Sequence, residues 1–233
     1  MIKTRIAWIL SLSCLLAIPL VSQDSTQIST IDVSESASVA APANLVRISF
    51  AVESNAAEAG EAVRLNAGQT DSLLKALKQK IGREDKLETS GYSLNPVYSR
   101  GDSQVTTGYR VRNTVILTSK DVGGAGAFID TATEAGANRI DSLSFAHDQA
   151  ETLRDQAAVK ALKKAFKTAE HLAEAAGMKI ARVVNIDYGS PGPAVRYSRA
   201  SLAEVGAGAP TPIEAGELSV SATVRVKFEI RGE

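Results

Sequence analysis

The chain has 233 residues, with 26 basic side chains, 26 acidic side chains and 44% hydrophobic residues. This composition is that of an ordinary folded protein, and it excludes a disordered tail, a collagen-like fibre and a basic domain that coats nucleic acid. A single cysteine and two histidines leave little material for mechanisms that need a metal, a thiol or an imidazole.

The first 22 residues are typical of an export signal. Lys3 and Arg5 precede an apolar run from Ile6 to Val21, which is too short to predict a membrane-spanning helix. We predict a signal peptide at 1–22 and a single exported domain at 23–233. An N-terminal anchor that is never cleaved is the alternative.

The exported domain would contain no thiol, because Cys14 lies inside the apolar run. A cysteine that accepts a lipid would end such a run, so we do not expect a lipoprotein. A chain without thiols suits an oxidising compartment. We therefore predict an exported protein in an oxidising compartment, with no membrane span in the mature chain.

The first half of the domain combines strand and helix patterns. Apolar and polar residues alternate over 31–52, which predicts two strands. Residues 57–81 carry a helical apolar stripe, and we expect Gly82 to end this helix in a left-handed conformation. A hairpin is predicted over 87–117, with a bulge at Gly91.

The second half continues with shorter segments and ends in a strand. A helix is predicted over 121–135, closed by Gly136, and a strand over 140–145. After a long helix, further strands are predicted over 180–188 and 218–230, the last with unbroken alternation.

The long helix is predicted to begin at Asp148, where Glu151 completes a capping pair, and to end at Gly177. Its apolar stripe is mainly alanine, so it can approach closely either a sheet of the same chain or a neighbouring subunit. We interpret the opposite face as solvated, with a site for an anionic surface as the alternative. That face carries Lys160, Lys163, Lys164, Lys167, His171 and Glu174.

Residues 189–216 form a long loop rich in proline and glycine, without a helical or strand period. Loops of this length inside a compact unit are usually functional or disordered. Arg196, Tyr197 and Arg199 in this loop are candidates for contact with a partner. A segment that becomes ordered only in an assembly, or never, is the alternative.

The elements together follow the order ββαββαβαββ. Hairpins mixed with helical connections predict an α+β fold, in which three helices pack on one face of a mostly antiparallel mixed sheet.

Two clusters near the start of the long helix contain residue types that are common in catalytic and metal sites. His147, Asp148 and Glu151 offer metal-ligand atoms, but we interpret them as capping residues. Ser144, His147 and Asp148 are the residue types of a catalytic triad, but near-consecutive residues rarely converge in one pocket. Neither cluster predicts a catalytic or metal site.

Gly123, Gly124 and Gly126 partly match a phosphate-binding loop. The third glycine of that motif is missing, because Ile129 holds its place. We therefore predict only a flexible start to the helix.

Tyr92, Tyr98, Tyr109 and Arg110 could together line a polar pocket. Tyrosines at sheet positions are more commonly core residues with a hydrogen-bonded hydroxyl, and this is our first interpretation. A small-ligand-binding protein, or an enzyme that uses such a pocket, is the alternative function.

Several short motifs occur in a fixed succession along residues 34–230. They comprise Thr89, Gly91, Tyr92, Ser93, Leu94, Pro96, Tyr98, Gly108, Tyr109, Gly136, Asn138, Phe145, Pro212 and Gly216. In these motifs the chain resembles the SIMPL-domain family, whose members are described as periplasmic or envelope immunogens and as oxidative-stress defence proteins. Some members assemble into large rings.

The resemblance implies an exported protein of the periplasm or cell envelope and carries over no catalytic residue. We therefore predict a non-enzymatic protein that forms a homo-oligomer and is associated with envelope or oxidative stress. We predict no cofactor, no metal and no nucleic-acid partner.

Overall fold

The computed structural model describes residues 28–99, 102–189, 196–197, 211 and 213–232. The predicted signal peptide, Arg199 and Pro212 lie outside these residues. The elements in chain order are β1 (Thr30–Pro42), β2 (Leu45–Ala56), α1 (Ala59–Lys80), β3 (Lys86–Ser99), β4 (Asp102–Ser119), α2 (Ala125–Glu134), β5 (Arg139–Ala146), α3 (Ala150–Ala175), β6 (Met178–Asp187), β7 (Arg196–Tyr197) and β8 (Glu217–Gly232). The predicted α+β class and element order are confirmed, and the two-residue strand β7 is added within the loop at 189–216.

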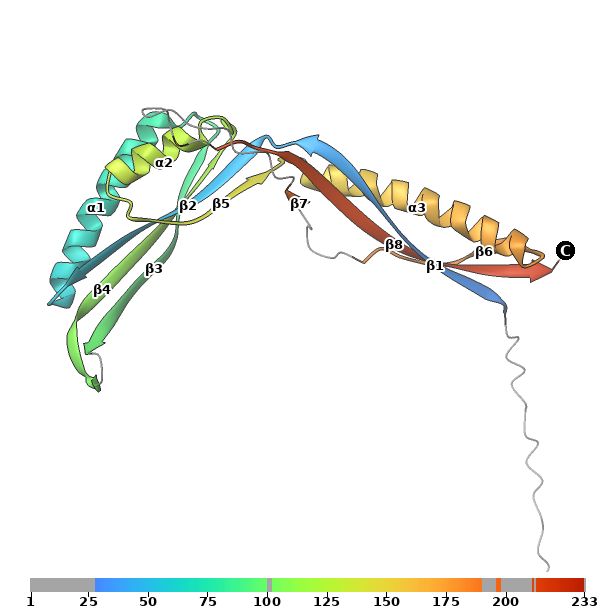
Figure 1. Cartoon of the computed structure of the whole chain (residues 1–233), viewed down its shortest axis with the longest axis horizontal. Helices are drawn as coiled ribbons and strands as arrows, with labels where there is room; N and C mark the ends of the chain where they lie inside the picture. Colours follow the sequence, from blue (N-terminus) through green and yellow to red (C-terminus); the bar gives the residue numbers. More distant parts are fainter. Residues whose placement is uncertain (1–27, 100–101, 190–195, 198–210, 212, 233) are drawn as a thin grey trace, which may run out of the picture.

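The strands are divided between two antiparallel sheets. One has the order β3-β4-β2-β5, and the other has the order β1-β8-β6, with β7 also paired to β8. Figure 1 shows α1 and α2 over the first sheet at one end of an elongated molecule, and α3 over the second sheet at the other end. The first and last strands of the domain lie side by side, since β1 pairs with β8 from Thr30 to Pro42.

The first core lies between α1, α2 and the sheet β3-β4-β2-β5. The alternation predicted for β2 is observed, because alternate side chains from Val46 to Val52 are fully buried. Leu73 and Leu77 of α1 pack against them. Leu218, at the start of β8, is buried in the same core and therefore ties the second sheet to the first. Burying one such aliphatic side chain contributes about 1.5–3 kcal/mol.

The second core lies between α3 and the sheet β1-β8-β6. A row of alanines on α3 is at most 1% exposed, and its spacing of four residues aligns the small side chains along one face. Phe166 of α3 meets Phe228 of β8 edge to face, with ring centroids 5.0 Å apart. The alanine row is Ala157, Ala161, Ala165, Ala169 and Ala173. Of the two neighbours left open by the sequence, the alanine row packs against the sheet of the same chain.

Glycine ends two of the three helices as expected. Gly136 and Gly177 follow α2 and α3 with φ of +112° and +69°, a region that favours residues without a Cβ. The prediction for Gly82 is wrong, since α1 ends at Ile81 in an extended conformation and Gly82 has no positive φ. The Gly82 N–H instead donates to Asp85 Oδ2 at 2.8 Å. The predicted bulge at Gly91 is confirmed by a register shift between Thr89 and Gly91.

Candidate functional site

The motif that ends at Asn138 joins α2 to the middle of β2. The Glu53 N–H donates to Asn138 Oδ1 at 2.9 Å, and Asn138 Nδ2 donates to the Glu53 carbonyl at 2.7 Å. Two steps earlier, Gly136 turns the chain with its positive φ, and Ala137 is buried in the first core together with Phe145. These residues hold β2 and α2 together, so their arrangement serves the fold rather than a reaction.

Two glycines are located where backbones approach closely. A Cβ on Gly108 would lie 2.8 Å from the carbonyl oxygen of Ala56. A Cβ on Gly126 would collide with the carbonyl of Thr211, whose hydroxyl donates to Asp130 Oδ1 at 2.7 Å. Gly126 of the phosphate-loop-like sequence therefore receives the segment before β8 instead of a phosphate group.

The motif on β3 forms an exposed edge. Tyr92, Leu94 and Tyr98 are 56%, 42% and 50% exposed, so the expectation that these tyrosines are core residues is wrong. β3 is the outer strand of its sheet, and α1 packs mainly on β2 and β4. The other motif positions of this strand are Thr89, Gly91, Ser93 and Pro96.

The alternative pocket around three tyrosines and Arg110 does not close into one site. Tyr92 pairs with Asn113, whereas Arg110 pairs with Asn95, three residues further along β3, so the two side chains lie on opposite faces. A hollow of about 380 Å³ is lined by Tyr109 and Arg110 but by neither Tyr92 nor Tyr98. Its other lining residues are Asn55, Ala56, Val97, Thr107 and Gly108.

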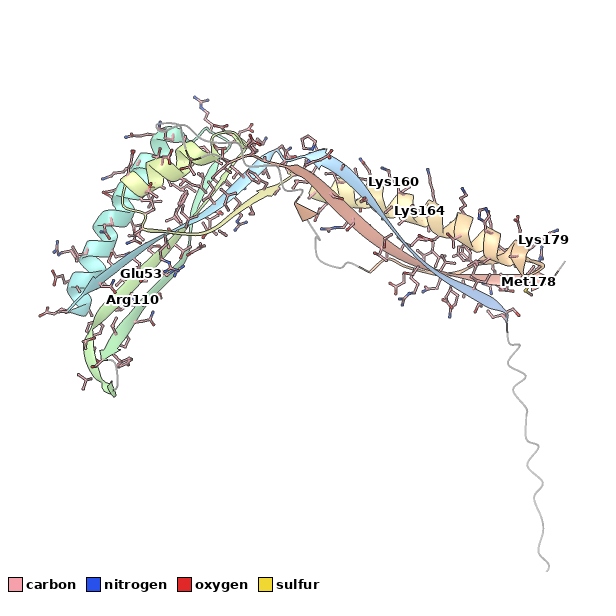
Figure 2. All side chains as sticks on the ribbon, in the orientation of Figure 1. Glu53, Arg110, Lys160, Lys164, Met178 and Lys179 are labelled. Carbon is pink, nitrogen blue, oxygen red and sulfur yellow. The ribbon has the colours of Figure 1, made fainter. Side chains whose placement is uncertain are left out.

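A charged cluster occupies the face of the same sheet that the helices leave uncovered. The Glu53 carboxylate, 19% exposed, lies 3.1 Å from Arg110 Nε and 3.9 Å from each of Arg112 and Arg139. Arg112 is also paired with Asp141. Figure 2 shows Glu53 and Arg110 beside each other on this sheet. The positive and negative charges of the cluster largely neutralise one another. Each partly exposed ion pair contributes about 0–1 kcal/mol to the stability of the fold.

The residues at the start of α3 anchor the helix, but not as a capping pair. The N-cap is Gln149, and it has no side-chain cap hydrogen bond, so the predicted pairing of Asp148 with Glu151 is wrong. Asp148 Oδ1 instead accepts from Asn44 Nδ2 at 2.7 Å, and the Asp148 N–H donates to Asn44 Oδ1 at 2.9 Å. The hydrogen bond from Asn44 lowers the pKa of Asp148 below its usual range.

His147 has no catalytic arrangement with its neighbours. Its Nδ1 accepts from the Gln149 N–H at 3.0 Å and lies 3.4 Å from Asp148 Oδ1. Ser144 belongs to β5, where it pairs with Arg47 of β2. In the part of the chain that the structure describes, no group of three or more histidine, cysteine, aspartate or glutamate side chains is arranged to hold a metal ion.

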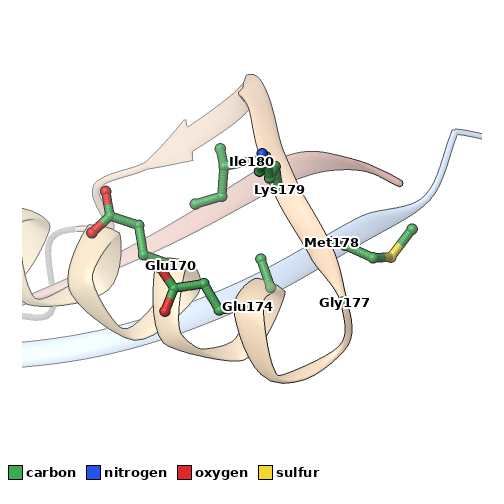
Figure 3. Close-up of a pocket in the computed structure, with 7 residues that line it drawn as sticks. Glu170, Glu174, Gly177, Met178, Lys179 and Ile180 are labelled. Atoms are coloured by element: carbon green, nitrogen blue, oxygen red, sulfur yellow. The ribbon is translucent and has the colours of Figure 1, made fainter. Parts of the chain in front are cut away.

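A hollow of about 510 Å³ lies at the turn from α3 to β6. Figure 3 shows Glu170 and Glu174 extending from α3, while the Met178 side chain on β6 is directed away from both carboxylates. Its remaining lining residues are Ala173, Gly177, Lys179 and Ile180. Two carboxylates without a third converging ligand do not make a metal site.

A buried polar network lies under α1 and was not predicted from the sequence. Asn66 is fully buried and donates to the carbonyl of Val52 at 2.9 Å and to Ser54 Oγ at 3.2 Å. Ser54 Oγ in turn donates to Gln69 Oε1 at 2.6 Å. The pattern of apolar residues in α1 did not predict this network, because a single asparagine on an apolar helix face looks only like a break in the pattern.

The last predicted positions lie in and after the loop. Arg196 and Tyr197 form β7, paired with Ser219 and Leu218 of β8. Gly216 is half-buried immediately before β8. None of the helices in the described ranges is both long enough and apolar enough to cross a membrane.

Comparison with known proteins gives one family and several relatives. The model of the SIMPL family, described as a protein of unknown function (DUF541), matches residues 31–228, from β1 to β8. The chain is 29% identical over 221 residues to the 26 kDa periplasmic immunogenic protein of Brucella melitensis, which covers 90% of this chain and 88% of that protein. It is 29% identical over 133 residues to the uncharacterized protein YggE of Escherichia coli, which covers 55% of this chain and 54% of that protein.

Proposed function

The chain belongs to the SIMPL family, and we propose that it is an exported, non-enzymatic protein of the periplasm or cell envelope. We further propose that it works as a homo-oligomer under envelope or oxidative stress. The name of the Brucella relative supports the location. Lys3, Arg5 and the apolar run after them support export by a signal peptide at 1–22.

The absence of converging reactive groups supports a role without catalysis. In the described ranges, His147 and Asp148 are engaged in structural contacts, and the serine, histidine and aspartate near α3 do not form a triad. Nucleophilic and acid–base catalysis rely on a nucleophile or base that is held within reach of a reacting atom, commonly by a third group.

The observation that carries the assembly proposal is the apolar character of two outer strands. Tyr92, Leu94 and Tyr98 are exposed on β3, and Ile186 on β6 is 49% exposed. β3 and β6 each end a sheet, so each presents unpaired backbone groups beside apolar side chains. The two edges differ from one another, and contacts between unlike surfaces build rings when the rotation closes.

Sedimentation velocity of edge variants tests the proposal. We expect Leu94→Lys and Ile186→Lys to shift the purified protein toward the single chain, because a buried, unpaired ammonium is costly in an interface. Leu172→Lys on α3 is the matched control, since Leu172 is 49% exposed and lies outside both edges. Assemblies that are unchanged in both edge variants would overturn the role of these strands.

A further inference from the structure

The exposed face of α3 carries four lysines without acidic partners. Successive helical residues are rotated by about 100°, so these lysines lie on one side of the helix, opposite the buried alanine row. They are Lys160, Lys163, Lys164 and Lys167, all exposed, and from Gln156 to Ala169 the helix has no acidic residue. The ion pairs described in this half of the molecule join Arg182 to Glu229 and Lys227 to Asp32, and none involves these lysines. Figure 2 shows Lys160 and Lys164 along α3.

Lys164 reaches from α3 around the edge of β1 to a groove on the face of β1 and β8 that is turned away from the helix. Its Nζ donates to the Ser36 carbonyl at 3.3 Å, so the side chain reaches the outer edge of β1. The acid nearest to it on that strand, Glu35, accepts from Thr168 Oγ1 at 2.8 Å. The Lys164 ammonium is therefore held at the strand edge without a carboxylate to neutralise it.

The groove has a volume of about 440 Å³ and an unusual lining. Apart from Ala37 and Lys164, every residue that lines it has a hydroxyl: Ser36, Ser38, Ser219, Ser221 and Thr223. Ser36 pairs with Thr223 and Ser38 with Ser221 across the strands, and Ser36 Oγ lies 2.8 Å from Thr223 Oγ1. Among the residues that the structure describes, no acidic side chain lines the groove.

We propose that this groove, with Lys164 at its edge, binds the phosphate group of an anionic ligand, either a lipid headgroup or a free phosphate ester. A phosphate offers several acceptor oxygens, each hydroxyl can donate one hydrogen bond, and an ammonium contact is charge-assisted. The ammonium of Lys164 disfavours a cation. Lys160, Lys163 and Lys167 lie on the far side of α3 from the groove, so they raise the positive potential of this half of the molecule without contacting the ligand. This binding role goes beyond the assembly proposed above.

Two binding measurements on the purified full chain separate the sources of phosphate. One is calorimetric titration with glycerol 3-phosphate, and the other is sedimentation with vesicles of phosphatidylglycerol, compared with phosphatidylcholine. A lysine near an anionic surface contributes a factor of about five in affinity, so Lys164→Gln should weaken binding at least fivefold. Ser221→Ala should weaken it without changing the charge. The matched controls are Lys78→Gln on α1 and Ser142→Ala on β5, both exposed and far from the groove.

The outcomes distinguish a free phosphate ester from a lipid headgroup, and some of them would contradict the proposed binding site. Binding to the ester that both groove variants weaken and both controls retain would support a free phosphate ester. The same pattern with phosphatidylglycerol vesicles alone would support a lipid headgroup. Absence of binding to either probe at millimolar phosphate, or equal losses in Lys164→Gln and Lys78→Gln, would overturn the proposal. A loss in Lys164→Gln with none in Ser221→Ala would overturn the groove.

Discussion

The carboxamide of Asn138 forms two hydrogen bonds with the backbone of Glu53, accepting at 2.9 Å and donating at 2.7 Å. The side chain thereby continues the pairing of β2 beyond Arg139, where β5 begins and pairs with Ala51. One motif residue thus takes the place of a missing strand residue.

We expect Asn138→Ala to lower the free energy of unfolding by about 1–3 kcal/mol, because each of the two hydrogen bonds contributes about 0.5–1.5 kcal/mol. Urea denaturation measures this change. Asn95→Ala, at an exposed position on β3, is the control and should change stability by less than about 0.5 kcal/mol. Equal stability of Asn138→Ala and wild type would show that the two hydrogen bonds between Asn138 and Glu53 contribute nothing to the stability of the fold.

The close approach of Thr211 to α2 predicts that Gly126 cannot be enlarged. We expect Gly126→Ala to destabilise the protein by about 1–3 kcal/mol, because the added methyl group meets a backbone carbonyl that has to move. Gly68→Ala, in the interior of α1 with no atom within 4 Å of the added Cβ, should instead stabilise by about 0.5–1 kcal/mol. Thermal unfolding of both variants checks the opposite signs.

The buried network under α1 predicts a cost for removing Asn66. Asn66→Ala removes the hydrogen bonds to the Val52 carbonyl and to Ser54 Oγ, which keeps only its bond to Gln69, and we expect the free energy of unfolding to fall by about 1–3 kcal/mol. Gln79→Ala, exposed on the same helix, is the control for helix propensity. A loss no larger than that of the control in urea denaturation would contradict the role of the network.

The contact between Asn44 and Asp148 predicts a pH dependence. Because the hydrogen bond lowers the pKa of Asp148 in the folded state, its contribution is present above the usual value of 3.8 and is lost as the pH falls through the folded-state pKa. NMR titration should find the pKa of Asp148 below 3.8 in the wild type and closer to 3.8 in Asn44→Ala. An unchanged pKa in that variant would contradict the assigned cause.

Patterns with a strict period predicted the structure well. The alternation of the last strand is confirmed, with every second residue from Leu218 to Phe228 buried. The residue spacing also located all three helices. These signals are local, since each side chain points to a face fixed by its own backbone.

Features that depend on partners in space were not predictable. Tyr92 and Tyr98 are exposed because β3 is an outer strand and α1 packs mainly on β2 and β4. The alternation of residues within a strand does not specify the order of strands in a sheet. Likewise, Asp148 has the residue type of an N-cap, but Asn44, 104 residues away in the sequence, binds it instead. The division into two sheets depends on the same long-range pairing.

The proposed homo-oligomer is tested most directly by the native mass of the protein. Size-exclusion chromatography with light scattering should be run on the wild type over a dilution series in the micromolar range. We expect a mass several times that of one chain, which is 24.5 kDa at full length. The mass of a single chain throughout the series would contradict it.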